Sequence, residues 1–160
     1  MGGVKVEKCT YLNALHGRPC ACADISGSEK CPKIKGKISF FETCDGVLVM
    51  AEVWGLPECD PVFGFHIHEG RRCCGIEKEP FADSGSHYDP MKTQHPYHSG
   101  DMPPLFGNCG HAFMVFLTRR FSIREIIGRT VIIHSRADDF TTQPSGNSGE
   151  KIACGVIRSC

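Results

Sequence analysis

Residues 33–41, with the sequence KIKGKISFF, alternate apolar and polar side chains with a period of two. The isoleucines and Phe40 therefore share one face of an extended chain, and the lysines share the other. Residues 47–54 form a second expected strand, and the intervening turn contains Asp45-Gly46, a common hairpin signal. This part of the sequence predicts an antiparallel β-hairpin with one face in the core.

Further strands are expected along the chain, at residues 19–25, 62–68, 112–117, 130–135 and 152–157. Residues 122–125, SIRE, have the form of a capping box, which favours a short helical turn, although a further strand is the alternative. About eight short strands with turns rich in Gly and Pro predict an all-β sandwich or barrel.

The chain of 160 residues suits one domain, residues 1–160, in which residues 1–17 are an N-terminal extension that can be flexible. Its 18 basic and 18 acidic residues balance, which argues against a nucleic-acid partner. No window approaches the roughly 18 apolar residues of a membrane span. The absence of an apolar signal segment predicts a cytoplasmic protein, or a periplasmic or extracellular one if the chain is a processed form.

The chain contains 11 cysteines, so an intramolecular pairing leaves at least one thiol over. Most are expected to be reduced, with one or a few specific bridges. Cys20 and Cys22 fall on the same face of an expected strand. This spacing is a weak metal-binding signal, and the other interpretation is two small buried residues.

One connection, about residues 69–106, is too long for a simple turn and is rich in Gly, Pro, His and charge. Such a long loop inside a compact domain is usually functional or disordered. The content of this loop favours a function.

Histidines end two of the expected strands. His66 and His68 lie on one face of residues 62–68, and the phenylalanines and Ile67 lie on the core face. His134 ends residues 130–134 and also points away from the core face. Each could be a surface histidine, but three strand-borne imidazoles with the same arrangement favour a metal site.

The long loop adds His87, His95, His98 and Asp101 within 15 residues, which is a good ligand set for tetrahedral zinc. Together with the strand histidines, these residues predict a two-metal site. The remaining histidines, His16 and His111, are interpreted as ordinary surface or strand residues.

The sequence resembles the copper–zinc superoxide dismutases, and more closely their bacterial members. The resemblance covers about residues 33–157 and rests on five motifs in family order. These are GFHIHE at 64–69, GSHYDP at 85–90, HSGD at 98–101, GRTVIIH at 128–134 and GNSGEKIACGV at 146–156.

The resemblance implies an eight-stranded Greek-key β-barrel with a long metal-binding loop. It implies copper and zinc as cofactors, with His87 bridging the two metals and Asp138 linking a copper histidine to a zinc histidine. Copper would be bound by His66, His68, His87 and His134, and zinc by His87, His95, His98 and Asp101. A disulfide would join Cys154 to Cys73, with Cys74 as a competitor for the loop position.

The implied activity is dismutation of superoxide to dioxygen and hydrogen peroxide by a redox-cycling copper. His87 would carry a proton, and Lys151 would guide the anion where most members have arginine. Lysine keeps the charge but loses the planar, two-pronged donor set. The alternative is a non-enzymatic or zinc-only member that binds or stores metal. Family members occur as monomers and dimers, so a homodimer is left open.

Overall fold

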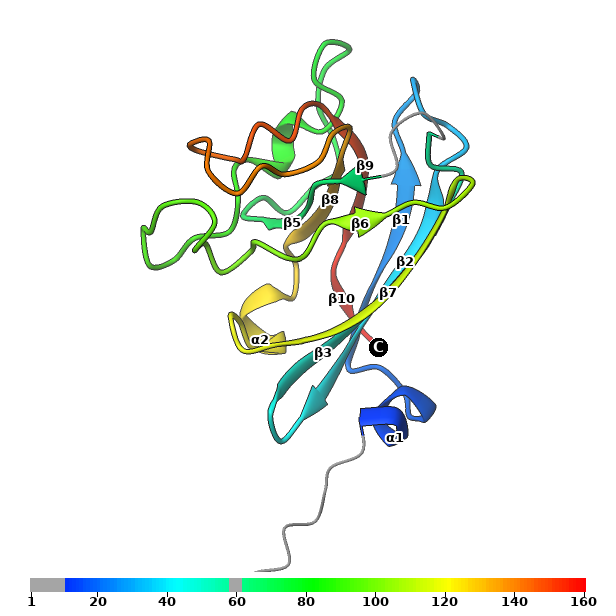
Figure 1. The fold of residues 1–160 in the computed structure, drawn as a ribbon, viewed down its shortest axis with the longest axis vertical. Helices are drawn as coiled ribbons and strands as arrows, with labels where there is room; N and C mark the ends of the chain where they lie inside the picture. The colour runs from blue at the N-terminus through cyan, green and yellow to red at the C-terminus, as the bar shows by residue number, and fades with distance from the viewer. Residues whose placement is uncertain (1–10, 58–61) are drawn as a thin grey trace, which may run out of the picture.

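A curled antiparallel sheet dominates the computed structural model, which describes residues 11–57 and 62–160 (Figure 1). Its strands follow the order β5-β8-β9-β1-β2-β3-β7, with β10 added beside β1 and a separate β4-β6 pair. The strands are β1 Ala21–Gly27, β2 Lys35–Thr43, β3 Gly46–Trp54, β4 Val62–Phe63, β5 Phe65–His68, β6 Leu105–Phe106, β7 His111–Thr118, β8 Thr130–His134, β9 Lys151–Val156 and β10 Arg158–Ser159. The all-β prediction is confirmed.

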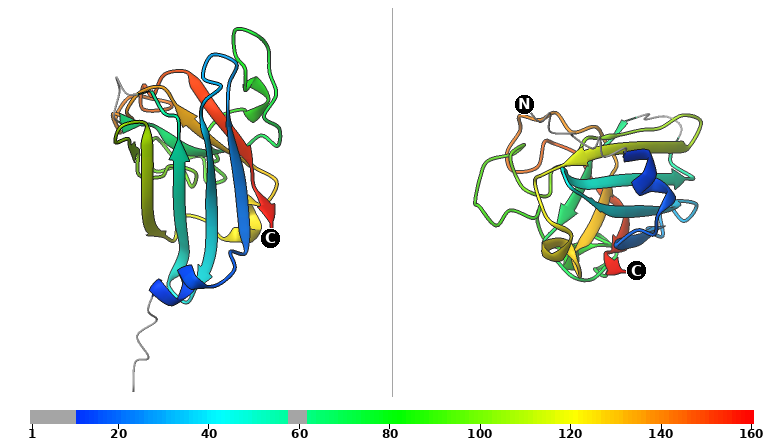
Figure 2. Two further views of the ribbon diagram at one scale, coloured as in Figure 1. Left: turned by 90° about the vertical axis from the view of Figure 1, so that its right-hand side faces the viewer. Right: turned by 90° about the horizontal axis from the view of Figure 1, so that it is seen from below.

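The expected hairpin is present as β2 and β3, which pair from Lys35↔Trp54 to Thr43↔Gly46. Gly46 has φ of 132°, which an L side chain rarely adopts, so the Asp-Gly signal is used as predicted. The left view of Figure 2 shows β1, β2, β3 and β7 side by side along one wall of the molecule.

The prediction of a single strand at residues 62–68 is wrong, because this segment forms two strands that are separated at Gly64. β4 pairs with β6, whereas β5 pairs with β8. A Cβ on Gly64 would lie 2.7 Å from the Cβ of Ser148, so the chain passes the loop before β9 closely enough to require glycine. β6 and β10 have two residues each and are too short to be predicted from the sequence pattern.

Three short helical elements complete the fold. Residues 122–125 adopt the helical alternative, because the backbone amide of Ser122 donates to Glu125 Oε2 at 2.7 Å at the start of α2 (Ile123–Ile126). α1 (Tyr11–His16) is an unpredicted helix within the expected extension, and residues 1–10 lie outside the described residues. A single 3₁₀ turn, η1 (Ala82–Ser84), lies in the long loop. No helix within the described ranges has the length and apolarity needed to cross a membrane.

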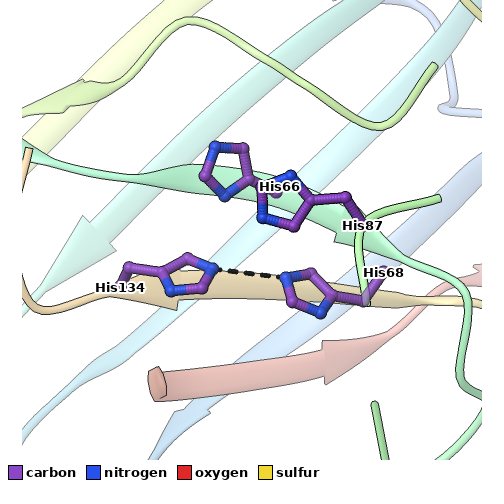
Figure 3. Close-up of side chains that lie close together, drawn as sticks. All are labelled: His66, His68, His87 and His134. Atoms are coloured by element: carbon purple, nitrogen blue, oxygen red, sulfur yellow. Dashed lines mark hydrogen bonds between the residues drawn. The ribbon is translucent and has the colours of Figure 1, made fainter. Parts of the chain in front are cut away.

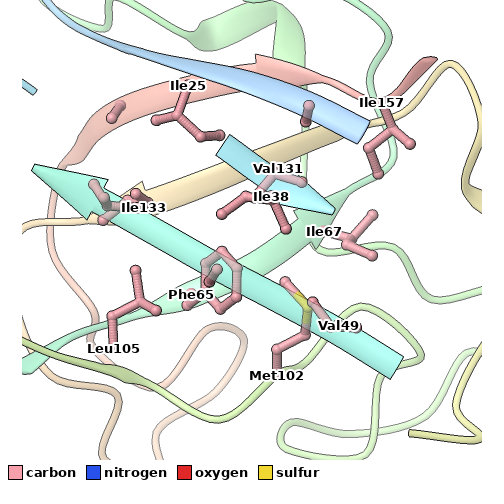
Figure 4. Packing of buried hydrophobic residues seen from close by; sticks show 14 of the residues in the cluster. Ile25, Ile38, Val49, Phe65, Ile67, Met102, Leu105, Val131, Ile133 and Ile157 are labelled. Carbon is pink, nitrogen blue, oxygen red and sulfur yellow. The ribbon is translucent and has the colours of Figure 1, made fainter. Parts of the chain in front are cut away.

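The main core fills the space inside the curled sheet. Side chains from β5 and β8 pack against side chains from β1, β2 and β3, and residues 102–105 add to the same cluster (Figure 4). The labelled members are Phe65, Ile67, Val131 and Ile133, then Ile25, Ile38 and Val49, and finally Met102 and Leu105. The core residues named are all at most 4% exposed, so the period-two pattern assigns the inner face correctly.

The outer face of β8 and β9 is also covered. Ile132 and Cys154 point away from the main core, and they form a second small apolar cluster with Phe81 and the half-buried Cys73. Cys73 and Cys154 are joined by a disulfide with a Cα–Cα distance of 5.7 Å. The long loop is therefore attached to the sheet beside the strand-borne histidines.

Candidate metal centre

Neighbouring strands bring His66, His68 and His134 together. β5 pairs antiparallel with β8, and the amide of His134 donates to the carbonyl of Gly64 at 2.8 Å. The three side chains leave the sheet on its outer face, as the sequence predicts. They are nevertheless buried, at 0%, 2% and 4% exposure, because the long loop and the segment before β9 cover them. The surface-histidine interpretation is therefore wrong.

His87 from the long loop completes a first group with these three residues, which we call the strand-side cluster (Figure 3). One ligand atom from each of the four histidines lies within 4.8 Å of all the others. His87 lies against His66, with their ring centroids 3.9 Å apart and the two rings tilted by 31°.

The protonation pattern of His68 and His134 leaves two lone pairs facing each other. The Nδ1–H of His68 donates to the carbonyl of Gly85 at 2.9 Å, and the Nδ1–H of His134 donates to that of Gly149 at 3.3 Å. Because a neutral imidazole carries one proton, both Nε2 atoms are bare, yet they lie only 3.2 Å apart. Two bare nitrogens in this position are suited to sharing a cation.

The other two members also offer unpartnered nitrogens. The Nε2–H of His66 donates to Asp138 Oδ2 at 2.7 Å, so its Nδ1 is bare. This Nδ1 atom and the Nε2 atom of His87 are buried and have no hydrogen-bond partner. Buried polar atoms of this kind require an explanation, and a bound metal would satisfy both.

A second group, the loop-side cluster, contains His87, His95, His98 and Asp101. His87 Nδ1 lies 2.8 Å from Asp101 Oδ1, and the Nδ1 atoms of His95 and His98 lie 3.1 and 3.3 Å from Asp101 Oδ2. All four residues are buried. Three imidazoles and a carboxylate match the ligands that zinc takes in tetrahedral sites.

Asp138 connects the two clusters. Its Oδ2 accepts from His66, and its Oδ1 accepts from His95 Nε2 at 2.8 Å and from the backbone amide of Phe140 at 2.7 Å. Gly146, with φ of 65°, passes so close that a Cβ there would lie 2.0 Å from Asp138 Oδ1. The carboxylate therefore fixes the orientation and tautomer of one histidine in each cluster.

Burial keeps the three strand-borne histidines, His66, His68 and His134, neutral. Desolvation lowers the pKa of His66 and His68 well below the ordinary value, and it lowers the pKa of His134 to about 4. Burial alone would raise the pKa of Asp101, but the hydrogen bond from His87 and the nearby imidazoles hold it below its ordinary value. Neutral imidazoles and an ionised carboxylate are the forms that bind metal ions.

Lys151 lies at the edge of the strand-side cluster. Its Nζ donates to the carbonyl of Gly85 at 3.0 Å, and the same carbonyl accepts from His68. Nζ also donates to the carbonyl of Phe81 at 3.4 Å and to Glu79 Oε1 at 3.1 Å. Glu79 is not predictable as a site residue from the sequence, because it belongs to no motif and meets Lys151 only through folding.

The other singled-out residues lie elsewhere. His111 stacks on Trp54, with ring centroids 5.3 Å apart, and His16 is an exposed residue of α1. Cys20 is exposed and Cys22 half-buried, so the interpretation as two small buried residues is wrong. Cys74 is exposed and lies outside the disulfide that Cys73 forms.

Comparison with known proteins gives a consistent result. The sequence pattern of the copper/zinc superoxide dismutase family matches residues 34–157. Superoxide dismutase [Cu-Zn] of Deinococcus radiodurans is 32% identical over 98% of this chain and 92% of its own, and that of Legionella pneumophila is 35% identical over 79% and 80%.

Solved structures of similar shape include the Cu/Zn superoxide dismutase from Brucella abortus, with a TM-score of 0.74 and 25% identity over 85% of this chain and 98% of that one. A double mutant of a SOD-like protein from Bacillus subtilis gives a TM-score of 0.72 with 28% identity, over 86% and 97% of the two chains. The chain therefore belongs to the copper/zinc superoxide dismutase family.

Proposed function

We propose that this protein catalyses the dismutation of superoxide to dioxygen and hydrogen peroxide. Copper would be held by the strand-side cluster, His66, His68, His87 and His134. Zinc would be held by the loop-side cluster, His87, His95, His98 and Asp101. The observation that carries the proposal is the position of His87, which presents Nε2 to one cluster and Nδ1 to the other.

Copper bound there would supply one-electron chemistry, which zinc does not have. His87 contributes a site for a proton, because its Nε2 can take up a proton and then give it to the product. Asp101, whose Oδ1 lies 2.8 Å from His87 Nδ1, would bind the zinc together with this ring and so keep it in place. Two superoxide anions and two protons give one dioxygen and one hydrogen peroxide, so the reaction balances.

Lys151 supplies the cation that attracts and orients the anionic substrate. It is 14% exposed in its side chain and shares the Gly85 carbonyl with His68, so its charge lies beside the strand-side cluster. The segment of residues 140–150 contains no Lys or Arg that could add to this attraction. Lys151 is therefore proposed as the main guide for superoxide.

The deciding experiment measures copper and zinc per chain together with superoxide consumption. We expect one copper and one zinc, and a fast loss of superoxide that disappears when copper is removed. A protein loaded with copper that fails to accelerate superoxide decay would instead support the second candidate, a family member that only binds or stores metal.

Glu79 is expected to weaken the attraction of superoxide by Lys151, because its carboxylate neutralises the charge of the Lys151 ammonium. The replacement Glu79→Gln should raise kcat/KM by about two- to threefold at low ionic strength, because one charge several ångströms from the substrate path contributes about 0.5 kcal/mol in a high dielectric. The gain should shrink as the Debye length falls to about 10 Å at 0.1 M salt. Pulse radiolysis at several salt concentrations measures both effects.

The matched control is Glu77→Gln, which removes the same charge two residues earlier in the same segment. It should change the rate less than Glu79→Gln, because Glu79 is the residue in contact with the Lys151 ammonium at 3.1 Å. Equal effects of the two variants would show that the contact itself is unimportant.

Asp138 is expected to set the metal affinity of both clusters. In Asp138→Asn, the amide nitrogen cannot accept a hydrogen bond, so either His66 or His95 loses its acceptor. Loss of such a partner typically weakens metal binding by about 10- to 100-fold. Competition with a chelator of known affinity measures the change for each metal.

The neighbouring carboxylate offers a control for this variant. Asp139 accepts hydrogen bonds from the amides of Thr141 and Thr142 and does not contact the clustered histidines in the described structure. Asp139→Asn should keep both metal affinities within about twofold. If Asp138→Asn behaves in the same way, the proposed link between the clusters is wrong.

We further propose that residues 1–160 act as one domain. The disulfide between Cys73 and Cys154 favours an oxidising compartment such as the periplasm over the cytoplasm. The homodimer stays a prediction, which sedimentation of the metal-loaded protein can test.

A further inference from the structure

A cluster of three cysteines, Cys20, Cys22 and Cys160, lies away from the metal ligands, where β10 pairs with the start of β1. Ala21 pairs with Ser159 and Cys22 pairs with Arg158. The backbone amide of Cys160 donates to the carbonyl of Cys20 at 3.1 Å, so the pairing continues by one residue. Figure 1 shows β10 beside the lower part of β1, away from the long loop that carries the metal ligands.

The pairing brings two thiols into contact. Cys160 Sγ donates to Cys22 Sγ across 2.8 Å, although the residues are 138 positions apart. Cys22 is half-buried and Cys160 is exposed, so small molecules in solution can reach the pair. β10 has only two residues, both exposed, so little packing opposes a small movement of Cys160 towards Cys22.

We propose that Cys22 and Cys160 are a second redox pair, which hydrogen peroxide converts into a disulfide. The inference rests on the proposed function only for the source of the oxidant, because dismutation generates hydrogen peroxide. The reactivity of the two thiols follows from their own positions.

The reaction needs no other reactant. Cys22, as thiolate, attacks one oxygen of hydrogen peroxide, the O–O bond breaks, and hydroxide leaves to become water. The resulting sulfenic acid is attacked by the sulfur of Cys160, which loses its proton and displaces a second water. Two thiols and one hydrogen peroxide thus give one disulfide and two waters, and each sulfur gives up one electron.

The hydrogen bond points to the order of these steps. It raises the pKa of the Cys160 thiol, because Cys160 holds the shared proton against Cys22. Cys160 is therefore the harder thiol to deprotonate, so we assign Cys160 to the second step and Cys22 to the first oxidation.

A metal site is the weaker interpretation of the same residues. Structural zinc takes four ligands. In the described part of the chain, groups of three or more donors within metal-binding distance are found only in the two histidine clusters. Cys20 lies beside the pair without completing such a group, and the close sulfur–sulfur contact suits a bond better than a bridged ion.

The test uses the full-length, metal-loaded protein with Cys73 and Cys154 already oxidised. One equivalent of hydrogen peroxide is added, remaining thiols are alkylated, and the protein is digested without reduction. We expect the loss of two thiols and a peptide linked through Cys22 and Cys160. The linked peptide should be absent from Cys22→Ser and Cys160→Ser and present in Cys20→Ser, the matched control.

A second measurement follows the stability of the oxidised protein. A disulfide that closes so long a loop should raise the melting temperature of the oxidised wild type by about 10 °C relative to equally treated Cys160→Ser. The wild-type peptide map does not depend on whether the variants fold.

Three results would overturn the proposal: a link to Cys20, a link between two chains, or oxidation of Cys22 to sulfinic acid without a link. Because the peroxide is added directly, the outcome does not depend on dismutation. A protein that lacks dismutase activity but forms the bond would refute the proposed function alone.

Discussion

Replacement of His134 by alanine is expected to reduce superoxide dismutation by at least ~100-fold and to remove copper while zinc stays bound. His134 belongs to the strand-side cluster and not to the loop-side cluster. Its bare Nε2 faces that of His68 at 3.2 Å, so its removal leaves the proposed copper site with three imidazoles. The loss of a supporting residue alone typically costs 10- to 100-fold in affinity or activity, and a ligand should cost more.

The experiment compares His134→Ala with His98→Ala, which removes a ligand of the loop-side cluster only. Metal content and superoxide consumption are measured for both proteins after the same loading procedure. His98→Ala should lose zinc and keep copper. If His134→Ala retains copper and activity, or loses zinc instead, the division of ligands between the metals is incorrect.

The second large effect concerns stability. Cys73→Ser is expected to lower the free energy of unfolding by about 4 kcal/mol, because the disulfide closes a loop between residues 81 positions apart. For a chain of this size, that change lowers the melting temperature by roughly 8–15 °C. The variant also loosens the small apolar cluster of Phe81, Ile132 and Cys154.

Cys74→Ser is the natural control, since Cys74 is the next residue, is exposed and lies outside the disulfide. It should unfold within about 1 °C of the wild type. Thermal unfolding of the metal-free proteins separates the effect of the disulfide from that of metal binding. A Cys73→Ser protein as stable as Cys74→Ser would show that the loop is held by other contacts.

The strand pattern and the set of candidate ligands were predictable because each depends on local spacing, whereas the division of the ligands between two clusters came from the family resemblance. Period-two alternation identifies the inner faces of β2, β5 and β8, and His-rich stretches at strand ends and in the long loop indicate the ligands. The split at Gly64 was not predictable, because it depends on Ser148, a residue 84 positions further along the chain.

Contacts between segments far apart in the sequence were also not predictable from local patterns. The burial of His66 and His68 depends on which face the long loop covers, and alternation in a strand contains no such information. The pairing of Lys151 with Glu79 and of Cys22 with Cys160 joins residues 72 and 138 positions apart. The assignment of copper and zinc to the two clusters rests on the family resemblance, because spacing alone does not distinguish the two metals.

The facing lone pairs of His68 and His134 make the stability of the folded protein depend on bound metal. Their two bare nitrogens, 3.2 Å apart, oppose the folded state when no cation lies between them, and a cation that binds only the folded state shifts the folding equilibrium by mass action. At a free metal concentration 1,000 times the dissociation constant, this shift amounts to about 4 kcal/mol. The folded chain is therefore expected to be less stable when metal is scarce, and thermal unfolding with and without a chelator measures the difference.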